Sequence, residues 1–517
     1  MNRLQVYLEE LQLPIKSLFV ATGLIAVGSI LGNPFINDIF LLDLPIIVTI
    51  TRLLLFTGGL IFACFPYIVF VKLLYSRTQE KNIVVVGIIA YLMYLIMILF
   101  FGATDLPDNM YISFIRLEIN DSIYRLVNTG VIGLIGVYFI VRKVYQKQMI
   151  ARNANFTKVF DRDTIRLIRS LIYTTIYGLF IAWMIPYISK GIYSILNFVA
   201  ADINNPMSLF AYSGFERILS LFGLQNIVRK EMWFGKLGGT WNSLENIGYM
   251  GDVNIWAAQL KDSVAVLGVG SAGRFTTVYY VLNIFAAPAY LAALATTVSD
   301  KPKFRRGLVT VFTGTVLSLL GGIWFPLEII MLLTAPIIYI FHLFMVGFIS
   351  AILLGISTTI GFSYLGIINA ANPGNIIDLI GISRNSMINR QIMMMLLLGL
   401  IVFFIYFYVV RFYYTHMAID ILNIGIKDDE IKDFIERIGG LENIEKISSS
   451  PTKVIVKLYN EDSINPAGLH RQGVTKIVQT REGFILLYGS GSYMMQKEIN
   501  KRLDAYKNEL MEVEEND

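Results

Sequence analysis

Two charged residues, Arg217 and Glu328, lie in apolar stretches of a 517-residue chain in which only 16% of residues are charged. A charge among membrane segments is costly, and it is therefore usually paired or functional. We expect both side chains to contact a solute or a gate. A purely structural ion pair is the alternative.

Two further pairs of residues could take part in the same chemistry. Gln225 and Asn226 carry amides that can hydrogen-bond the hydroxyl groups of a polyol. Trp324 and Phe325 offer aromatic faces that could stack on the apolar face of a sugar ring or simply fill a pocket. Together with Arg217 and Glu328, these four residues form the expected substrate-binding set, to which the family resemblance given below assigns them.

Other kinds of site are poorly supported by the sequence. The single cysteine, Cys64, excludes an internal disulfide and a cysteine-based zinc site. Three scattered histidines do not form a metal-binding pattern. Walker and dinucleotide-binding motifs are missing, since the short Gly489-Ser490-Gly491 run does not fit either. We expect no metal and no cofactor.

The composition indicates that these residues belong to a membrane protein. The chain is 55% hydrophobic and has a mean hydropathy of +0.60, whereas soluble proteins carry about a quarter charged residues. Most of the chain is therefore expected to lie in the lipid bilayer. The net charge of +5 comes from short loops rather than one basic patch, which does not favour nucleic acid as a partner.

Apolar runs long enough to span a membrane recur through the chain, at about 20 residues per crossing. The first run lacks a basic leader and a cleavage site, so we expect a retained helix rather than a signal peptide. We predict about ten spans plus re-entrant hairpins, with the spans at 14–32, 46–72, 83–102, 126–141, 167–189, 276–298, 307–323, 328–345, 346–366 and 392–411.

The charged loops predict the direction of these spans. Basic residues gather in three loops, near Lys72 to Lys81, between Arg142 and Arg169, and between Lys301 and Arg306, and such loops are usually cytoplasmic. The loops near Asp38 and Asp105 are acidic or neutral. The even number of spans then places both termini in the cytoplasm.

Two stretches interrupt the pattern of spans. Residues 206–222 are amphipathic and 223–274 are polar, and a Gly pair and a Pro break the apolar run at 321–326. Paired interruptions of this kind point to a solute site in membrane transporters. A long extracellular loop with one kinked helix is the alternative.

A second domain is expected after the spans. We predict a membrane domain at 1–415 and a small α/β domain at 428–508, followed by an acidic, frayed tail at 509–517. Within the small domain, 431–438 and 493–503 are predicted helices, Gly439-Gly440 closes the first of them, and 454–458 and 484–488 are predicted strands.

Several segments together resemble a known family, the membrane permeases (EIICB) of the glucose, maltose and N-acetylglucosamine branch of the bacterial phosphotransferase system. The resemblance rests on Leu13-Pro14, Ala272-Gly273-Arg274-Phe275, Lys301-Pro302-Lys303, Gly322 to Glu328, Ala335 to Tyr339 and Gly439 to Ile444. It implies an EIIC-like membrane domain that forms a homodimer, an EIIB-like cytoplasmic domain, and the cell membrane of a bacterium. It also places His342 away from the site, as a packing residue.

The resemblance further implies a relay in which a cysteine of EIIB passes phosphate to the sugar. Ser450 occupies the place of that cysteine here, and a serine hydroxyl is a far weaker nucleophile than a thiol. Gln225 and Asn226 replace the family's paired histidines, and Phe325 replaces its first glutamate. We therefore expect no catalytic residue and degenerate phosphorylation motifs.

These observations favour transport of a sugar or sugar-like solute without coupled phosphorylation. One alternative is a sugar-sensing receptor that signals through the EIIB-like domain to a cytoplasmic protein partner. Another is an active sugar phosphotransferase that uses the phosphocysteine of a partner chain.

Overall fold

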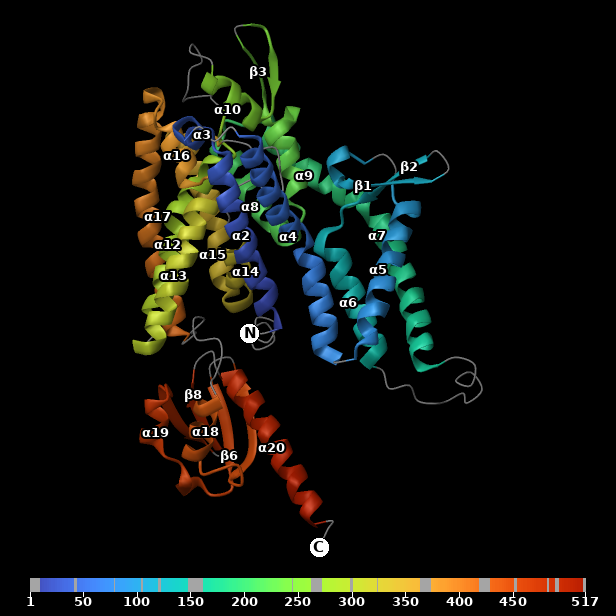
Figure 1. Ribbon diagram of the computed structural model, residues 1–517, viewed down its shortest axis with the longest axis vertical. Coiled ribbons are helices and arrows are strands. Elements are labelled where there is room, and N and C mark those ends of the chain that lie inside the picture. Colours follow the sequence, from blue (N-terminus) through green and yellow to red (C-terminus); the bar gives the residue numbers. More distant parts are fainter. Residues whose placement is uncertain are drawn as a thin grey trace.

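The computed structural model of the chain describes residues 10–40, 44–78, 80–103, 106–119, 122–146, 161–243, 245–261, 272–297, 301–322, 324–362, 373–417, 428–450, 453–480, 483–488 and 492–514. Within these residues a large helical part is followed by a smaller unit of strands and helices (Figure 1). This arrangement agrees with the predicted fold class.

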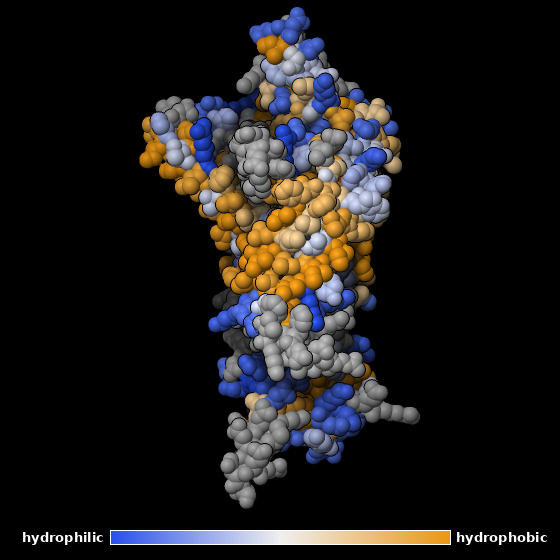
Figure 2. All heavy atoms as spheres, turned by 90° about the vertical axis from the view of Figure 1, so that its right-hand side faces the viewer, coloured by the Kyte–Doolittle hydropathy of each residue, from blue (hydrophilic) through white to orange (hydrophobic). Residues whose placement is uncertain are grey.

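Seven described helical segments are long and apolar enough to cross a membrane. They are α2 (Gln12–Gly32), α4 (Pro45–Thr78), α5 (Asn82–Phe101), α7 (Arg162–Ala201), the continuous run of α11 (Thr277–Val281), η4 (Leu282–Ala286) and α12 (Ala287–Thr296), α15 (Pro336–Gly355) and α17 (Asn389–His416). Many large apolar side chains on these helices are exposed, including Ile176, Trp183 and Phe404. Figure 2 shows hydrophobic residues gathered on the middle of the helical part, with hydrophilic residues toward both ends. This surface suits a lipid bilayer.

The three remaining predicted spans correspond to helices that are short or only partly apolar, α6 (Gly130–Gln146), α13 (Lys301–Gly321) and α14 (Phe325–Thr334). The predicted division between 328–345 and 346–366 is wrong. Helix α14 ends at Thr334, because Ala335 has a non-helical ψ of 72°. Pro336 then begins α15, which continues without a break to Gly355. Proline suits the first turn of a helix because no hydrogen-bond donor is needed there.

The helix ends that carry the basic loops lie at one end of the helical part. The C-terminal ends of α4 and α6 and the N-terminal ends of α5, α7 and α13 point toward the end at which the smaller unit lies (Figure 1). α2 also begins at this end. These helix ends and the C-terminal unit therefore lie toward the same end of the helical part.

The polar stretch after α7 contains short elements rather than a simple span. α8 (Pro206–Leu221) is followed by α9 (Gln225–Arg229), the π-helical η2 (Lys230–Phe234), the η3 turn (Lys236–Gly238), a hairpin of β3 (Thr240–Asn242) and β4 (Gly248–Met250), and α10 (Asp252–Lys261). A second hairpin, of β1 (Tyr111–Ile119) and β2 (Ser122–Val127), follows the η1 turn (Asp108–Met110). The sequence did not predict either hairpin. The remaining short helices are α3 (Pro34–Phe40), α16 (Ile376–Ile382) and η6 (Ser386–Ile388).

The C-terminal unit is an antiparallel sheet of order β5-β6-β8-β7 with helices packed on it. Its elements are α18 (Asp428–Arg437), β5 (Ile444–Ser450), β6 (Lys453–Leu458), η7 (Glu461–Ser463), α19 (Pro466–Arg471), β7 (Lys476–Thr480), β8 (Gly483–Leu487) and α20 (Ser492–Glu514). Phe434, Val454, Leu486 and Ile499 belong to its core. The two predicted helices and two predicted strands are confirmed. The expectation of a frayed tail from residue 509 is wrong as far as Glu514, because α20 extends to that residue.

Candidate functional site

The site is built around α8, whose start is fixed by local sequence. The Asn205 side chain accepts a hydrogen bond from the Met207 amide, and Pro206 occupies the first turn. The helix ends just before Gly223, whose φ of +69° favours glycine. The chain can therefore turn there, and α9 begins at Gln225 next to the end of α8.

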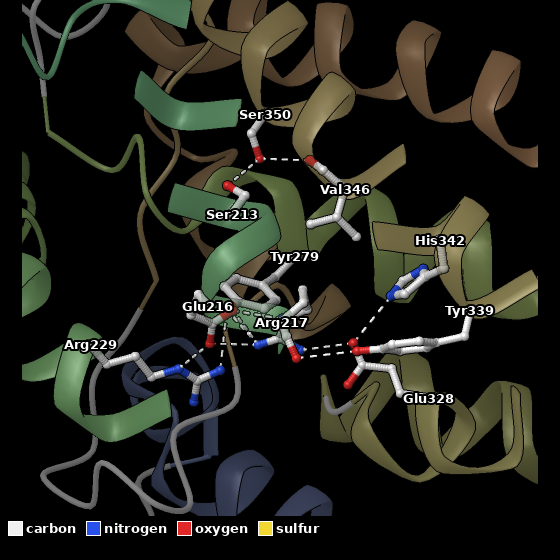
Figure 3. A network of polar contacts seen from close by, with 10 residues as sticks. All are labelled: Ser213, Glu216, Arg217, Arg229, Tyr279, Glu328, Tyr339, His342, Val346 and Ser350. Atoms are coloured by element: carbon white, nitrogen blue, oxygen red, sulfur yellow. Dashed lines mark hydrogen bonds and ion pairs between the residues drawn. The ribbon is translucent and has the colours of Figure 1, made fainter. Parts of the chain in front are cut away.

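Glu216 and Arg217, on successive positions of α8, form the centre of a buried polar network (Figure 3). Glu216 accepts two hydrogen bonds of 2.6 Å from Arg217, one of 2.8 Å from Arg229 Nε and one of 2.9 Å from the Tyr279 hydroxyl. Arg217 and Arg229 also donate to the Tyr279 oxygen, at 2.9 and 3.2 Å. Glu216 is therefore saturated with donors, which favours its ionised form.

Glu328 on α14 is fully buried but much less well satisfied. Its Oε1 accepts a hydrogen bond of 3.5 Å from Arg217 Nη1 and lies 3.1 Å from His342 Nε2. Its Oε2 has no hydrogen-bond partner among the described residues. His342 Nδ1 lies 2.8 Å from the Tyr406 hydroxyl. α15 brings the His342 ring directly against Glu328 (Figure 3). His342 is fully buried and does not line the cavity described below, so its expected role as a packing residue stays a prediction.

The turn between α13 and α14 places the two predicted aromatic residues. Gly322, with a φ of +60°, ends α13 and Phe325 begins α14. Trp324 stacks on the His342 ring at 5.0 Å between centroids, and its Nε1 has no hydrogen-bond partner among the described residues. Phe325 contacts Phe62 and Phe65 of α4, each at 6.1 Å between centroids. Phe325 thus forms part of an aromatic wall.

A cavity of about 350 Å³ lies between α4, the start of α6, the ends of α8 and α9, and the α13–α14 turn. This volume is within the range of small-molecule sites, about 300 to 1,000 Å³. Five of the six predicted substrate residues line it, namely Arg217, Gln225, Asn226, Trp324 and Phe325. Glu328 does not line the cavity, but it accepts a hydrogen bond from Arg217, which does.

Several residues of this site were not predicted from the sequence. Arg229, Lys230 and Tyr279 line the cavity, and Glu216 links two of them. Partial burial lowers the pKa of Lys230, and the Asp108 carboxylate acts in the opposite direction. The adjacent charges at 216 and 217 and at 229 and 230, in otherwise apolar surroundings, were the available signal. Tyr279 gave none, because many tyrosines occur in the apolar helices.

Ser450 lies far from this cavity in sequence, on the C-terminal sheet. It is the last residue of β5 and pairs with Lys453 at the start of β6. Residues 451 and 452 between them lie outside the described residues. The position is therefore at the tip of a hairpin.

Together these features define a multi-pass membrane protein with a charged, solute-sized cavity in its helical part and a small α/β unit at its C-terminal side. The chain is similar to the PTS system glucoside-specific EIICBA component of Staphylococcus carnosus (strain TM300), with 25% identity over 390 residues. The similarity covers 73% of this chain and 54% of the relative, so the chain spans about half the length of the curated relative it matches. The chain matches no protein-family model.

Proposed function

We propose that this chain carries a sugar or sugar-like solute across the cell membrane of a bacterium without phosphorylating it. The observation that carries the proposal is the convergence of Arg217, Gln225, Asn226, Trp324 and Phe325 on one cavity. The similar protein is described as glucoside-specific, which agrees with a sugar as the solute.

Two unsatisfied polar atoms of the cavity residues support a hydroxylated solute. Gln225 Oε1 is a buried acceptor, and Trp324 Nε1 a buried donor, with no partner among the described residues. A buried polar atom without a partner costs about 1–3 kcal/mol. Because a sugar hydroxyl is both donor and acceptor, it can satisfy atoms of either kind.

The residues available for phosphorylation support transport without it. The only cysteine of the chain, Cys64, belongs to α4, whereas the hairpin tip of the C-terminal unit carries Ser450. Phe325 has no carboxylate that could accept a proton from a sugar hydroxyl. Transport would then rely on movement of the cavity-bearing half of the membrane domain against a half that forms a homodimer, with both termini in the cytoplasm.

Uptake of radiolabelled sugars by proteoliposomes that contain only the purified chain tests this function. We expect uptake that does not change when phosphoenolpyruvate and the general phosphotransfer proteins are added. Strict dependence on them would contradict the proposal and favour an active phosphotransferase. Sugar binding without any flux would also contradict it and favour a receptor that signals through the C-terminal unit to a cytoplasmic protein.

Replacement Gln225→Ala should separate binding from folding. The free protein loses only an unsatisfied acceptor, so its melting temperature should stay unchanged or rise slightly. The dissociation constant for the transported sugar should increase about tenfold, since one hydrogen bond to the solute is lost. Calorimetric titration and thermal unfolding measure the two quantities. The exposed Gln479→Ala on β7 is the matched control, and equal affinities of the two variants would show that Gln225 does not contact the solute.

A further inference from the structure

The charged residues that line the cavity all have the same sign. Arg217, Arg229 and Lys230 line it, and none of the lining residues that the structure describes is acidic. An environment of this kind attracts anions, because the low-dielectric walls weaken the screening of the cations.

The carboxylates that compensate the arginines stand outside the cavity lining. Glu216 and Glu328 are 2% and 0% exposed and contact the arginines without lining the cavity themselves. In Figure 3 the Glu216 carboxylate lies between the Arg217 and Arg229 side chains. The two arginines and two glutamates balance in charge, and the Asp108 carboxylate acts on Lys230 from outside the cavity lining.

Both arginines keep donor capacity that the network does not use fully. Arg229 donates through Nε and Nη2, and its Nη1 makes no hydrogen bond to a described residue. Arg217 Nη1 makes only the 3.5 Å contact with Glu328. Because both side chains donate to the one Tyr279 oxygen, their guanidinium groups lie close together. Two neighbouring guanidinium groups suit the oxygens of a carboxylate or a phosphate.

We propose that the solute of this cavity is a sugar derivative that carries an anionic group, a carboxylate or a phosphate, which Arg217, Arg229 and Lys230 bind. The inference rests on the proposed function and specifies its substrate class. The sugar ring would lie against Trp324 and Phe325, which line the same cavity. A neutral sugar would offer no anionic acceptor to the donors that Arg217 and Arg229 do not use fully in the network.

Binding measurements on the full chain in lipid nanodiscs test the inference with glucose, glucuronate and glucose 6-phosphate as probes. At least one anionic probe should bind about tenfold or more tightly than glucose, with an affinity that falls as salt is added. The stronger of the two anionic probes identifies carboxylate or phosphate as the recognised group.

Replacement Lys230→Gln should weaken binding of that anionic probe about tenfold and weaken glucose binding much less. Lys190→Gln, the same charge change at an exposed position of α7 outside the cavity lining, should alter neither. Glucose binding as tightly as both anions would overturn the inference and leave the proposed function intact. An equal loss for all three probes in Lys230→Gln would also overturn it. Failure of every probe to bind would overturn the proposed function together with the inference.

Discussion

Replacement Glu216→Ala is expected to destabilise the helical part of this protein by about 3–5 kcal/mol. Glu216 is 2% exposed and accepts hydrogen bonds from Arg217, Arg229 and Tyr279. Its removal leaves two buried guanidinium groups with Glu328 as the remaining carboxylate of the network, in contact with only one of them. An unpaired buried charge costs more than the pair contributes. Thermal unfolding in detergent, followed by intrinsic tryptophan fluorescence, measures the change.

Two other glutamates calibrate this result. Glu245, an exposed residue between β3 and β4, should tolerate replacement by alanine without a change in melting temperature. Glu328→Gln should destabilise less than Glu216→Ala, because Glu328 makes only a 3.5 Å and a 3.1 Å contact through Oε1 and none to a described residue through Oε2. A melting temperature of Glu216→Ala equal to that of the wild type would contradict the assigned network.

Replacement Trp324→Ala is expected to abolish solute uptake and to cost about 3–5 kcal/mol of stability, as usual for a large buried aromatic residue. Trp324 is 2% exposed, lines the cavity and stacks on His342. The alanine variant loses both the packing contact and the aromatic surface for the sugar. Uptake by proteoliposomes and thermal unfolding report the two losses.

The matched variant Trp324→Phe retains a ring but removes the indole Nε1, which lacks a partner among the described residues. We expect much of the lost stability to return, while the solute still binds about tenfold more weakly than in the wild type. Wild-type affinity in Trp324→Phe would show that the indole nitrogen does not donate to the solute.

Hydrophobic runs and helix-breaking residues carried most of the fold information in the sequence. The long helices α2, α5 and α17 agree closely with predicted runs, since each is apolar and ends at a turn. Hydropathy alone did not locate the break at Ala335, because Ala-Pro lies within a continuous apolar run. The β1–β2 hairpin was missed because its strands lie between spans, and β5 because its serines and charged residues conceal the alternation of a strand.

The site was predictable where the chain itself is unusual. The interruptions at 206–274 and 321–326 pointed to these segments, and the family resemblance then singled out Gln225, Trp324 and Phe325, which line the cavity. The role of Glu328 in contacting Arg217 depends on how α14 packs beside α8, and the position of His342 depends on α15. A single sequence does not encode such tertiary distances in a readable pattern, so Tyr279 was not recognised and the contact between His342 and Glu328 was not predicted.

Transfer of radiolabelled phosphate tests the central claim most directly. The purified chain, in membranes with its sugar, is incubated with labelled phosphoenolpyruvate and the general phosphotransfer proteins, and both protein and sugar are then examined for label. We predict that neither becomes labelled, while uptake of the sugar proceeds. Label on the C-terminal unit that then moves to the sugar would contradict the account.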